Sequence, residues 1–135
     1  MQILHEIPNL NFKSHRGILN VCDLENQQFL VKRFYYISNV PNGKSRGLHG
    51  HKKLKQMFFA LSGEFTLNAT DGEVSDSVVL SAHGPGYLLP AGYWRELSNF
   101  SNDGICLVLA SESYNPSDYI YSFDEYLNWR KIGRN

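Results

Sequence analysis

The feature that most limits the possible folds is a series of short apolar runs separated by turn residues. Runs rich in aromatic and β-branched residues occupy 18–23, 29–40, 55–61, 64–70, 74–80, 86–89 and 104–110. Between two of these runs stands Asp71-Gly72, a dipeptide typical of a tight hairpin turn. Many short strands separated by turn residues are typical of an all-β sandwich or barrel, which we therefore predict.

Only the C-terminus has a helical pattern. Ser122 and Glu125 have the spacing of a capping box, in which two polar side chains close the first turn of a helix. Phe123, Tyr126 and Leu127 follow at helical spacing. We predict a short helix that packs on the outside of the β core, within a single domain covering residues 1–135.

Charge and cysteine content exclude several classes of protein. Lys plus Arg and Asp plus Glu both number 13, a balance that argues against a protein dedicated to nucleic acid or membrane surfaces. No apolar run approaches the roughly 20 residues that span a bilayer, and residues 1–10 lack the apolar core of a signal peptide. Cys22 and Cys106 lie in apolar runs and are expected to be reduced. We expect a cytoplasmic protein.

Two histidines carry the first chemical signal. His49 and His51 are two residues apart, so in a strand both rings project from the same face. Two imidazoles side by side suit half of a metal site or an acid/base pair. The alternative is that they are two histidines without any chemical role.

The segments 46–63 and 84–99 together resemble the two sequence motifs of the cupin superfamily. The matching positions are His49, His51, Gly63, Gly84, Pro90, Gly92 and Asn99. The chain departs from the motifs at Gln56, where cupins have a metal-binding carboxylate, and at Arg95, where they have a third histidine. A guanidinium has no lone pair for a cation, and a neutral amide is a weak ligand. We therefore predict a cavity without metal.

A closer resemblance is to the dTDP-sugar 3,4-ketoisomerases. It is carried by segments 32–37 (KRFYYI) and 46–56 (RGLHGHKKLKQ) and extends over about residues 12–130. It implies a cupin-type jelly roll, usually a homodimer, that needs no cofactor. The implied reaction converts dTDP-4-keto-6-deoxyglucose into the 3-keto isomer, which an aminotransferase converts to a 3-amino-3,6-dideoxy sugar for surface glycans.

Within this hypothesis the residues have distinct roles. Moving a carbonyl from C4 to C3 requires proton transfers, for which imidazole is suited because its reference pKa is about 6.5. We assign His49 as the principal acid/base, His51 as its partner in proton transfer or substrate orientation, and Tyr35 as a donor to the enediolate oxygens. Tyr35 shares a strand face with Arg33; a core aromatic with a satisfied hydroxyl is the alternative.

The substrate-binding residues are expected to be basic or polar. Arg95 is predicted to stabilise sugar oxygens, and Arg33, Arg46 and Arg16 to contact the diphosphate, because guanidinium groups match phosphate oxygens. Each of the last three could equally be a surface charge. Gln56 is also expected to bind the substrate.

Two other functions stay open at this stage. A metal-free cupin epimerase would act on the same keto-sugar nucleotide and invert a centre rather than move the carbonyl. A non-catalytic sugar-nucleotide-binding cupin would explain the departures at Arg95 and Gly50 as signs of a degraded site. A metal-dependent dioxygenase is disfavoured by Gln56 and Arg95.

Overall fold

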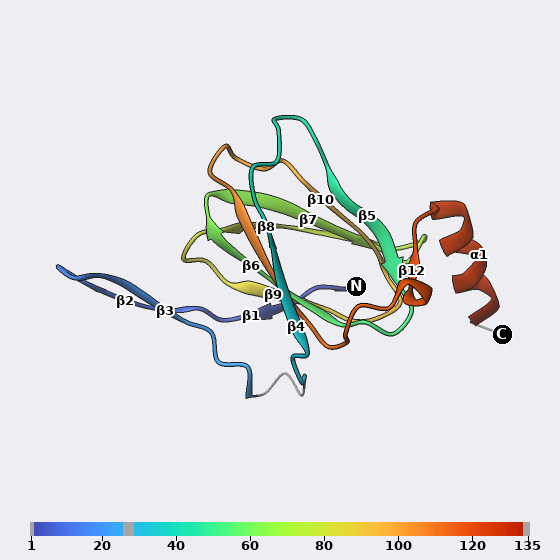
Figure 1. The fold of residues 1–135 in the computed structure, drawn as a ribbon, viewed down its shortest axis with the longest axis horizontal. Helices are drawn as coiled ribbons and strands as arrows, with labels where there is room; N and C mark the ends of the chain where they lie inside the picture. Colours follow the sequence, from blue (N-terminus) through green and yellow to red (C-terminus); the bar gives the residue numbers. More distant parts are fainter. Residues whose placement is uncertain (1, 26–28, 134–135) are drawn as a thin grey trace.

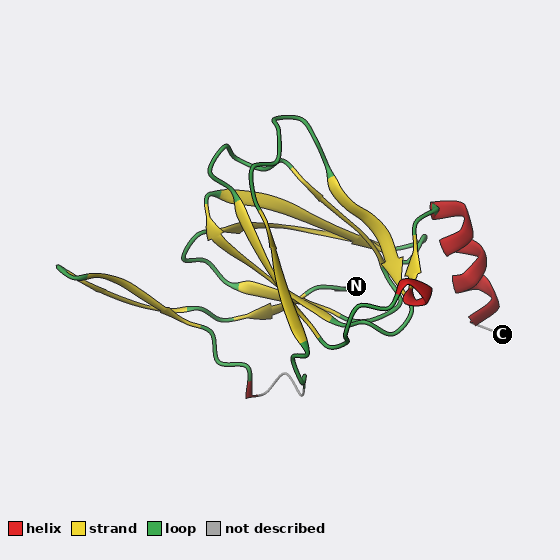
Figure 2. Cartoon of the chain, in the orientation of Figure 1, coloured by secondary structure: helices red, strands yellow, loops and turns green. Residues whose placement is uncertain are grey.

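Two five-stranded antiparallel sheets pack face to face in the computed structural model, which describes residues 2–25 and 29–133. The first sheet has the order β1 (His5–Ile7), β9 (Gly86–Leu89), β6 (Gln56–Ser62), β11 (Ile105–Ala110) and β4 (Arg33–Ile37). The second has the order β12 (Tyr119–Ile120), β5 (Arg46–His51), β10 (Trp94–Ser98), β7 (Glu64–Thr70) and β8 (Ser75–Ser81). Figure 2 shows how strands dominate the chain, so the all-β prediction is confirmed.

The core lies between the two sheets and follows the alternation of each strand. In β7 every second residue from Phe65 to Ala69 is buried, and in β11 the inward residues are Cys106, Val108 and Ala110. All of these side chains except Ala110 belong to one apolar cluster. Removing apolar surface from water contributes about 25 cal/mol per Å², so this cluster is the main source of the fold's stability.

A two-stranded arm projects from this body. It consists of β2 (Leu10–Ser14) and β3 (Gly17–Val21), which pair with each other in a hairpin and with no other described strand. Figure 1 shows the arm extending far from the sheets. All ten of its strand residues are exposed, including several large apolar ones. The sequence analysis identified β3 but missed β2.

The predicted C-terminal helix is present as α1 (Phe123–Gly133), after a short 3₁₀ helix, η2 (Pro116–Asp118). The Ser122 hydroxyl accepts a hydrogen bond from the Glu125 amide at 3.3 Å, as the capping box predicted. Tyr126 is completely buried where α1 packs on the end of the sheets. No helix in the described part of the chain is long and apolar enough to cross a membrane. Cys22 and Cys106 are both free thiols.

Candidate active site

The strand order of the second sheet brings the predicted site residues together. β5 lies between β10 and β12, and the register places His49 opposite Arg95 and His51 opposite Tyr119. The two imidazole rings share one face of β5, with centroids 4.6 Å apart in an edge-to-face arrangement. This juxtaposition is the one that the two-residue spacing predicted.

The histidine face of β5 borders a cavity of about 540 Å³. His49, Tyr35 and Arg95 line it together with Arg33 and Arg46. A sugar with its phosphates fits a cavity of this size, because small-molecule sites are commonly 300–1,000 Å³. The cavity therefore gathers a possible base, a phenol and three guanidinium groups around one volume.

β4 supplies two of these side chains through its alternation. Arg33 and Tyr35 are half-buried and point inward, while Phe34 and Tyr36 point outward and are each 65% exposed. The Arg33 guanidinium donates to the Tyr119 hydroxyl at 2.7 Å and to the Glu112 carbonyl at 3.1 Å. Arg33 is thus fixed at the rim of the cavity by side-chain and main-chain oxygens.

Arg95 is buried, with only 2% of its surface exposed, and is held by polar contacts on several sides. Its Nε donates to Gln56 Oε1 at 2.8 Å and its Nη2 donates to the Tyr35 hydroxyl at 3.0 Å. Its Nη1 donates to the Gly47 carbonyl at 3.3 Å. A buried cation with this many acceptors is a fixed positive charge beside the histidines.

Burial and this charge control the protonation of the site. Burial, followed by the Arg95 charge, lowers the pKa of His49 to about 3. The pKa of His51 falls to about 2, first through burial and then through the charges of Arg95, His49 and Arg33. Burial raises the pKa of Tyr35 above its usual value. At neutral pH the site therefore holds two neutral imidazoles and a protonated phenol.

A neutral imidazole has one ring nitrogen that can accept a proton. The Nε2 atoms of His49 and His51 are buried and have no hydrogen-bond partner within the described residues. His51 is only 3% exposed and lies behind His49, packed edge-on against Tyr119 with centroids 4.4 Å apart. His49 borders the cavity and His51 does not.

Two predicted substrate contacts are placed elsewhere. Gln56 is 1% exposed and lies behind Tyr35 and Arg95, outside the cavity lining, because its side chain is turned into the core between the sheets. Arg16 is exposed in the turn of the β2–β3 arm, which extends away from the cavity. Neither Gln56 nor Arg16 lines this cavity, and their contact with a substrate stays a prediction.

The sequence analysis missed an aromatic wall. Tyr114, Tyr119 and Tyr121 line the cavity beside Arg33, whose guanidinium lies over the Tyr114 ring and donates to the Tyr119 hydroxyl. The Tyr119 and Tyr121 rings are stacked with centroids 5.6 Å apart, and both lie within 6 Å of the His49 ring. The available signal was the spacing of Tyr119 and Tyr121, which places both on one face of an extended segment.

The departure at Gly50 has a packing cause. A Cβ on Gly50 would lie 2.9 Å from the Tyr126 ring of α1. Gly50 therefore faces the helix, on the side of β5 opposite the histidines. Its lack of a side chain serves the close approach of Tyr126 and is no sign of a degraded site.

The polar groups around the cavity are poorly suited to a metal ion. The described residues contain no group of three or more His, Cys, Asp or Glu side chains that could hold one. Of the residues at the cupin ligand positions, two are imidazoles, Gln56 is engaged with Arg95, and Arg95 is itself a cation. The metal-free cavity stays a prediction, for which this donor set is the physical argument.

Comparisons with known proteins agree with this geometry. The sequence model of the family described as FdtA, WxcM-like, C-terminal matches residues 2–131. The TDP-4-oxo-6-deoxy-alpha-D-glucose-3,4-oxoisomerase of Aneurinibacillus thermoaerophilus is 32% identical over 121 residues, which are 87% of each chain.

Solved structures extend the similarity to the fold. A 3,4-ketoisomerase from Helicobacter canadensis has a TM-score of 0.87 and 32% identity over 95% of this chain and 97% of that one. A histidine-to-asparagine mutant of the 3,4-ketoisomerase QdtA from Thermoanaerobacterium thermosaccharolyticum, in complex with TDP-4-keto-6-deoxyglucose, has a TM-score of 0.89 and 28% identity. That match covers 98% of this chain and 96% of QdtA. The cupin-type fold expected from the sequence is thereby confirmed.

Proposed function

This chain belongs to the FdtA family of WxcM-like C-terminal domains, and from that premise we propose that it is a sugar-nucleotide 3,4-ketoisomerase. Its substrate is dTDP-4-keto-6-deoxyglucose and its product is the 3-keto isomer. The observation that carries the proposal is the arrangement of neutral His49 beside Tyr35 and buried Arg95 on one cavity.

The reaction moves hydrogen between neighbouring carbons and needs no net oxidant. A base removes the proton from C3, the electron pair forms a C3–C4 double bond, and the C4 carbonyl electrons move onto oxygen. A proton is then delivered to C4 while the C3 hydroxyl proton is transferred to the C4 oxygen, so that C3 becomes the new carbonyl and C4 carries the hydroxyl. His49 is the acid/base for these transfers, since its neutral ring borders the cavity. His51, behind it, keeps the His49 ring in place.

Arg95 and Tyr35 act on the oxygens that become charged. A fixed guanidinium and a positioned phenol stabilise an enediolate because their dipoles need no rearrangement when the charge develops. Negative charge brought by the substrate and the intermediate also offsets the Arg95 field, so the pKa of His49 rises as the proton arrives. Because its pKa is low, His49 is neutral and able to accept a proton when the substrate binds.

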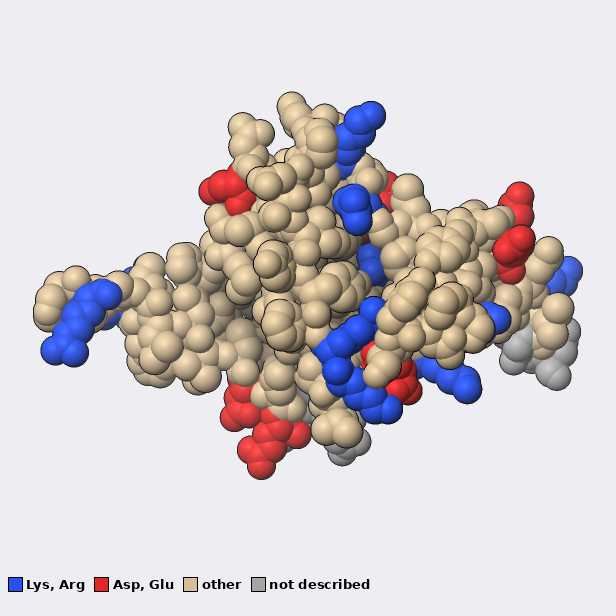
Figure 3. Space-filling view, viewed as in Figure 1, with Lys and Arg blue, Asp and Glu red and all other residues tan. Residues whose placement is uncertain are grey.

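The nucleotide lies towards the basic side of the cavity. A neighbouring hollow of about 440 Å³ shares Arg33, Tyr114 and Tyr119 with the cavity and adds Lys32 and Lys53. Figure 3 shows Lys and Arg side chains gathered along the middle of this face. The diphosphate binds Arg33 and Arg46, which leaves the sugar inside the cavity.

The exposed aromatic rings at the cavity suit the nucleobase. Tyr114 and Tyr121 are both more than half exposed, and Tyr121 stacks on Tyr119. A thymine base that stacks on this wall would bury apolar ring surface of both partners.

The product then passes to an aminotransferase in the cytoplasm. This compartment is reducing and suits the free thiols of Cys22 and Cys106.

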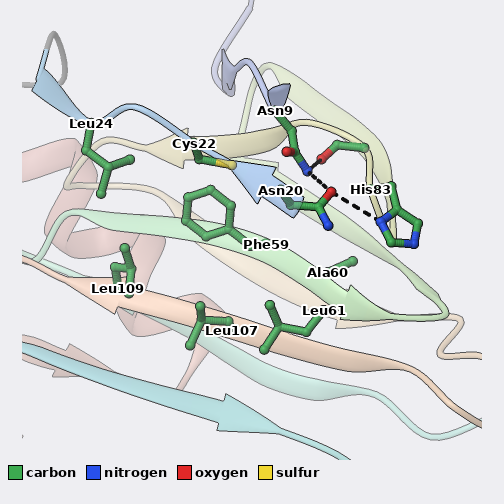
Figure 4. A pocket seen from close by; sticks show the side chains of 11 residues that line it. Asn9, Asn20, Cys22, Leu24, Phe59, Ala60, Leu61, His83, Leu107 and Leu109 are labelled. Carbon is green, nitrogen blue, oxygen red and sulfur yellow. Dashed lines mark hydrogen bonds between the residues drawn. The ribbon is translucent and has the colours of Figure 1, made fainter. Parts of the chain in front are cut away.

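The protein acts as a homodimer through its arm and the outer face of the first sheet. The exposed large apolar residues include Leu10, Phe12, Ile18, Leu19 and Val21 on the arm, and Phe34, Tyr36 and Leu61 on the sheet. A groove of about 250 Å³ runs between the base of the arm and this sheet (Figure 4). Exposed apolar surface on this scale is typical of an interface, and a second copy offers the same apolar surface in return.

The arm gives Arg16 a place in the proposed dimer. Arg16 sits in the turn at the end of the arm, away from the cavity of its own chain. If it binds the diphosphate, it does so in the cavity of the second copy. The complete site then depends on both chains.

The test is incubation of the purified protein with dTDP-4-keto-6-deoxyglucose, coupled to a 3-aminotransferase, with the product structure determined by proton NMR. We expect a 3-amino sugar, and deuterium at C4 when the reaction is run in deuterated water. His49→Asn should lower kcat by about 10²–10⁴-fold, the usual contribution of an acid/base group.

The alternatives give different products in the same assay. An epimerase would return a 4-keto sugar with an inverted centre, and a binding protein would return the substrate unchanged at any protein concentration. Either result would refute the proposal.

A further inference from the structure

Three polar side chains form a closed group at the floor of the cavity. Arg95 Nε donates to Gln56 Oε1 at 2.8 Å, Gln56 Nε2 donates to the Tyr35 hydroxyl at 2.8 Å, and Arg95 Nη2 donates to the same hydroxyl at 3.0 Å. Gln56 and Arg95 are almost completely buried. Water therefore has no access to Gln56, so these three groups must satisfy one another.

Chemistry fixes the orientation of the Gln56 amide. A guanidinium only donates hydrogen bonds, so the atom of Gln56 that faces Arg95 must be the carbonyl oxygen. The amide nitrogen then necessarily faces Tyr35. This orientation follows from donor and acceptor roles and needs no view of the hydrogen atoms.

The same counting fixes the proton of Tyr35. A phenol oxygen has two acceptor positions, and here Gln56 and Arg95 occupy both. Neither neighbour offers an acceptor to the hydroxyl, because one presents an N–H₂ group and the other is a cation. The Tyr35 proton must therefore point in the remaining direction, which is the cavity that Tyr35 lines.

We propose that Gln56 is a positioning residue whose amide polarity directs the Tyr35 hydroxyl proton into the cavity, towards the oxygen that becomes an enediolate. This inference rests on the proposed isomerase function and assigns Gln56 a role without substrate contact. A carboxylate of the same size would accept the Tyr35 proton and turn it away from the substrate. The distinction between amide and carboxylate, rather than bulk or burial, is what matters at this position.

Gly47 keeps Arg95 from leaving this arrangement. Its backbone has φ +66°, and a Cβ there would overlap Arg95 Nη1. The guanidinium thus fills the space beside Gly47 and donates to its carbonyl. With Arg95 fixed from this side, Tyr35 keeps both of its donors.

The test measures kcat and KM of Gln56→Glu, alone and combined with Tyr35→Phe, in the coupled assay with dTDP-4-keto-6-deoxyglucose. We expect Gln56→Glu to lower kcat by about 10²-fold, the usual effect of losing one oriented donor to a developing oxyanion, with KM changed by less than about threefold. In the Tyr35→Phe background, Gln56→Glu should lower kcat by about tenfold at most.

Asn68→Asp is the matched control. It also converts an amide to a carboxylate, on β7, where Asn68 bonds with Ser98 and Ser77 outside the cavity. Its kcat should stay within about twofold of the unchanged enzyme. If Gln56→Glu does not fold, Gln56→Met takes its place in the test. Its loss of kcat should likewise be smaller in the Tyr35→Phe background.

Two results overturn the inference while the proposed function stands. One is a Gln56→Glu enzyme whose kcat is within about twofold of the unchanged enzyme. The other is an equal loss of kcat with and without the Tyr35 hydroxyl, which would indicate a structural effect. If instead the unchanged enzyme forms no 3-keto product, the proposed function fails and this inference fails with it.

Discussion

The protonation of the histidine pair gives the sharpest prediction. At pH 6 a histidine with a pKa of about 6.5 would be neutral in only about 24% of molecules. With its pKa lowered to about 3 by burial and the Arg95 charge, His49 is protonated in only about 0.1% of molecules at that pH. If neutral His49 is the base, almost all of the free enzyme therefore stays in the active protonation state in the weakly acidic range.

The assay is the pH dependence of kcat/KM, which reports the protonation of the free enzyme. We expect no acid limb between pH 8 and pH 5, with the coupling enzyme in excess at each pH. An acid limb of kcat/KM with a midpoint near pH 6.5 would refute the reasoning. The ring protons of His49 and His51 should likewise show no NMR titration over this range.

Arg95→Met separates the two causes of the shift. The guanidinium is the second cause after burial for both histidines, so its removal should raise the pKa of His49 and that of His51. The values should stay below 6.5, because burial remains. Unchanged histidine titrations in this variant would show that the Arg95 charge does not reach them.

The same shifts make the fold sensitive to acid. Both histidines have a pKa in the folded chain below the value of about 6.5 in the unfolded chain. Between these values the unfolded chain binds more protons, so the free energy of unfolding decreases as the pH falls from 6.5 towards 3. Denaturant midpoints measured across this range should fall less steeply for His51→Asn.

Three further predictions concern the dimer, the helix and metal content. An equal mixture of Arg16→Ala and His49→Asn chains, refolded together, should recover about a quarter of the normal activity if Arg16 serves the second copy. Half of the dimers are then mixed, and each mixed dimer has one intact site out of two. An activity no higher than the sum of the separate variants would place Arg16 elsewhere. Tyr126→Phe loses a buried hydrogen bond of 2.7 Å to the Gly92 carbonyl, which should lower the unfolding free energy by about 1 kcal/mol and the Tm by about 4 °C in calorimetry, with kcat unchanged. Elemental analysis should find less than about 0.1 metal ion per chain, since the Arg95 charge opposes a cation; stoichiometric zinc or iron would contradict this.

The parts of the site that the sequence predicts depend on strand alternation. The common face of His49 and His51, and that of Arg33 and Tyr35, follows from the period of two in a strand, and the structure has both pairs as expected. Alternation says nothing of depth within the core. Gln56 therefore looked like a substrate contact, although its side chain ends at Arg95 and Tyr35 before it reaches the cavity.

Arg16 shows a second limit. The position of Arg16 relative to the cavity depends on tertiary contacts, which leave no pattern in the neighbouring sequence. A contact with a second chain would leave no such pattern either. β2 was missed because its two apolar residues, Leu10 and Phe12, alternate with polar ones, so no continuous apolar run marks it.

The two faces of β5 and β10 divide catalysis from support. On one face His49 lies opposite Arg95, and on the other Gly50 lies opposite Trp94. Trp94 packs against Tyr126 of α1, and Gly50 leaves the space that this ring needs. The helix thereby supports, from the opposite face, the two strands that carry the proposed base His49 and the neighbouring cation Arg95.

This division implies that stability and catalysis can be changed separately in the same strands. A substitution that enlarges Gly50 should push Tyr126 away and loosen α1, because the Cβ contact is only 2.9 Å. Its effect on His49 would pass through the backbone of β5 alone, since the two side chains point in opposite directions. Gly50→Ala should therefore lower the Tm more clearly than kcat/KM, and the reverse order would mean that α1 contributes directly to the geometry of the base.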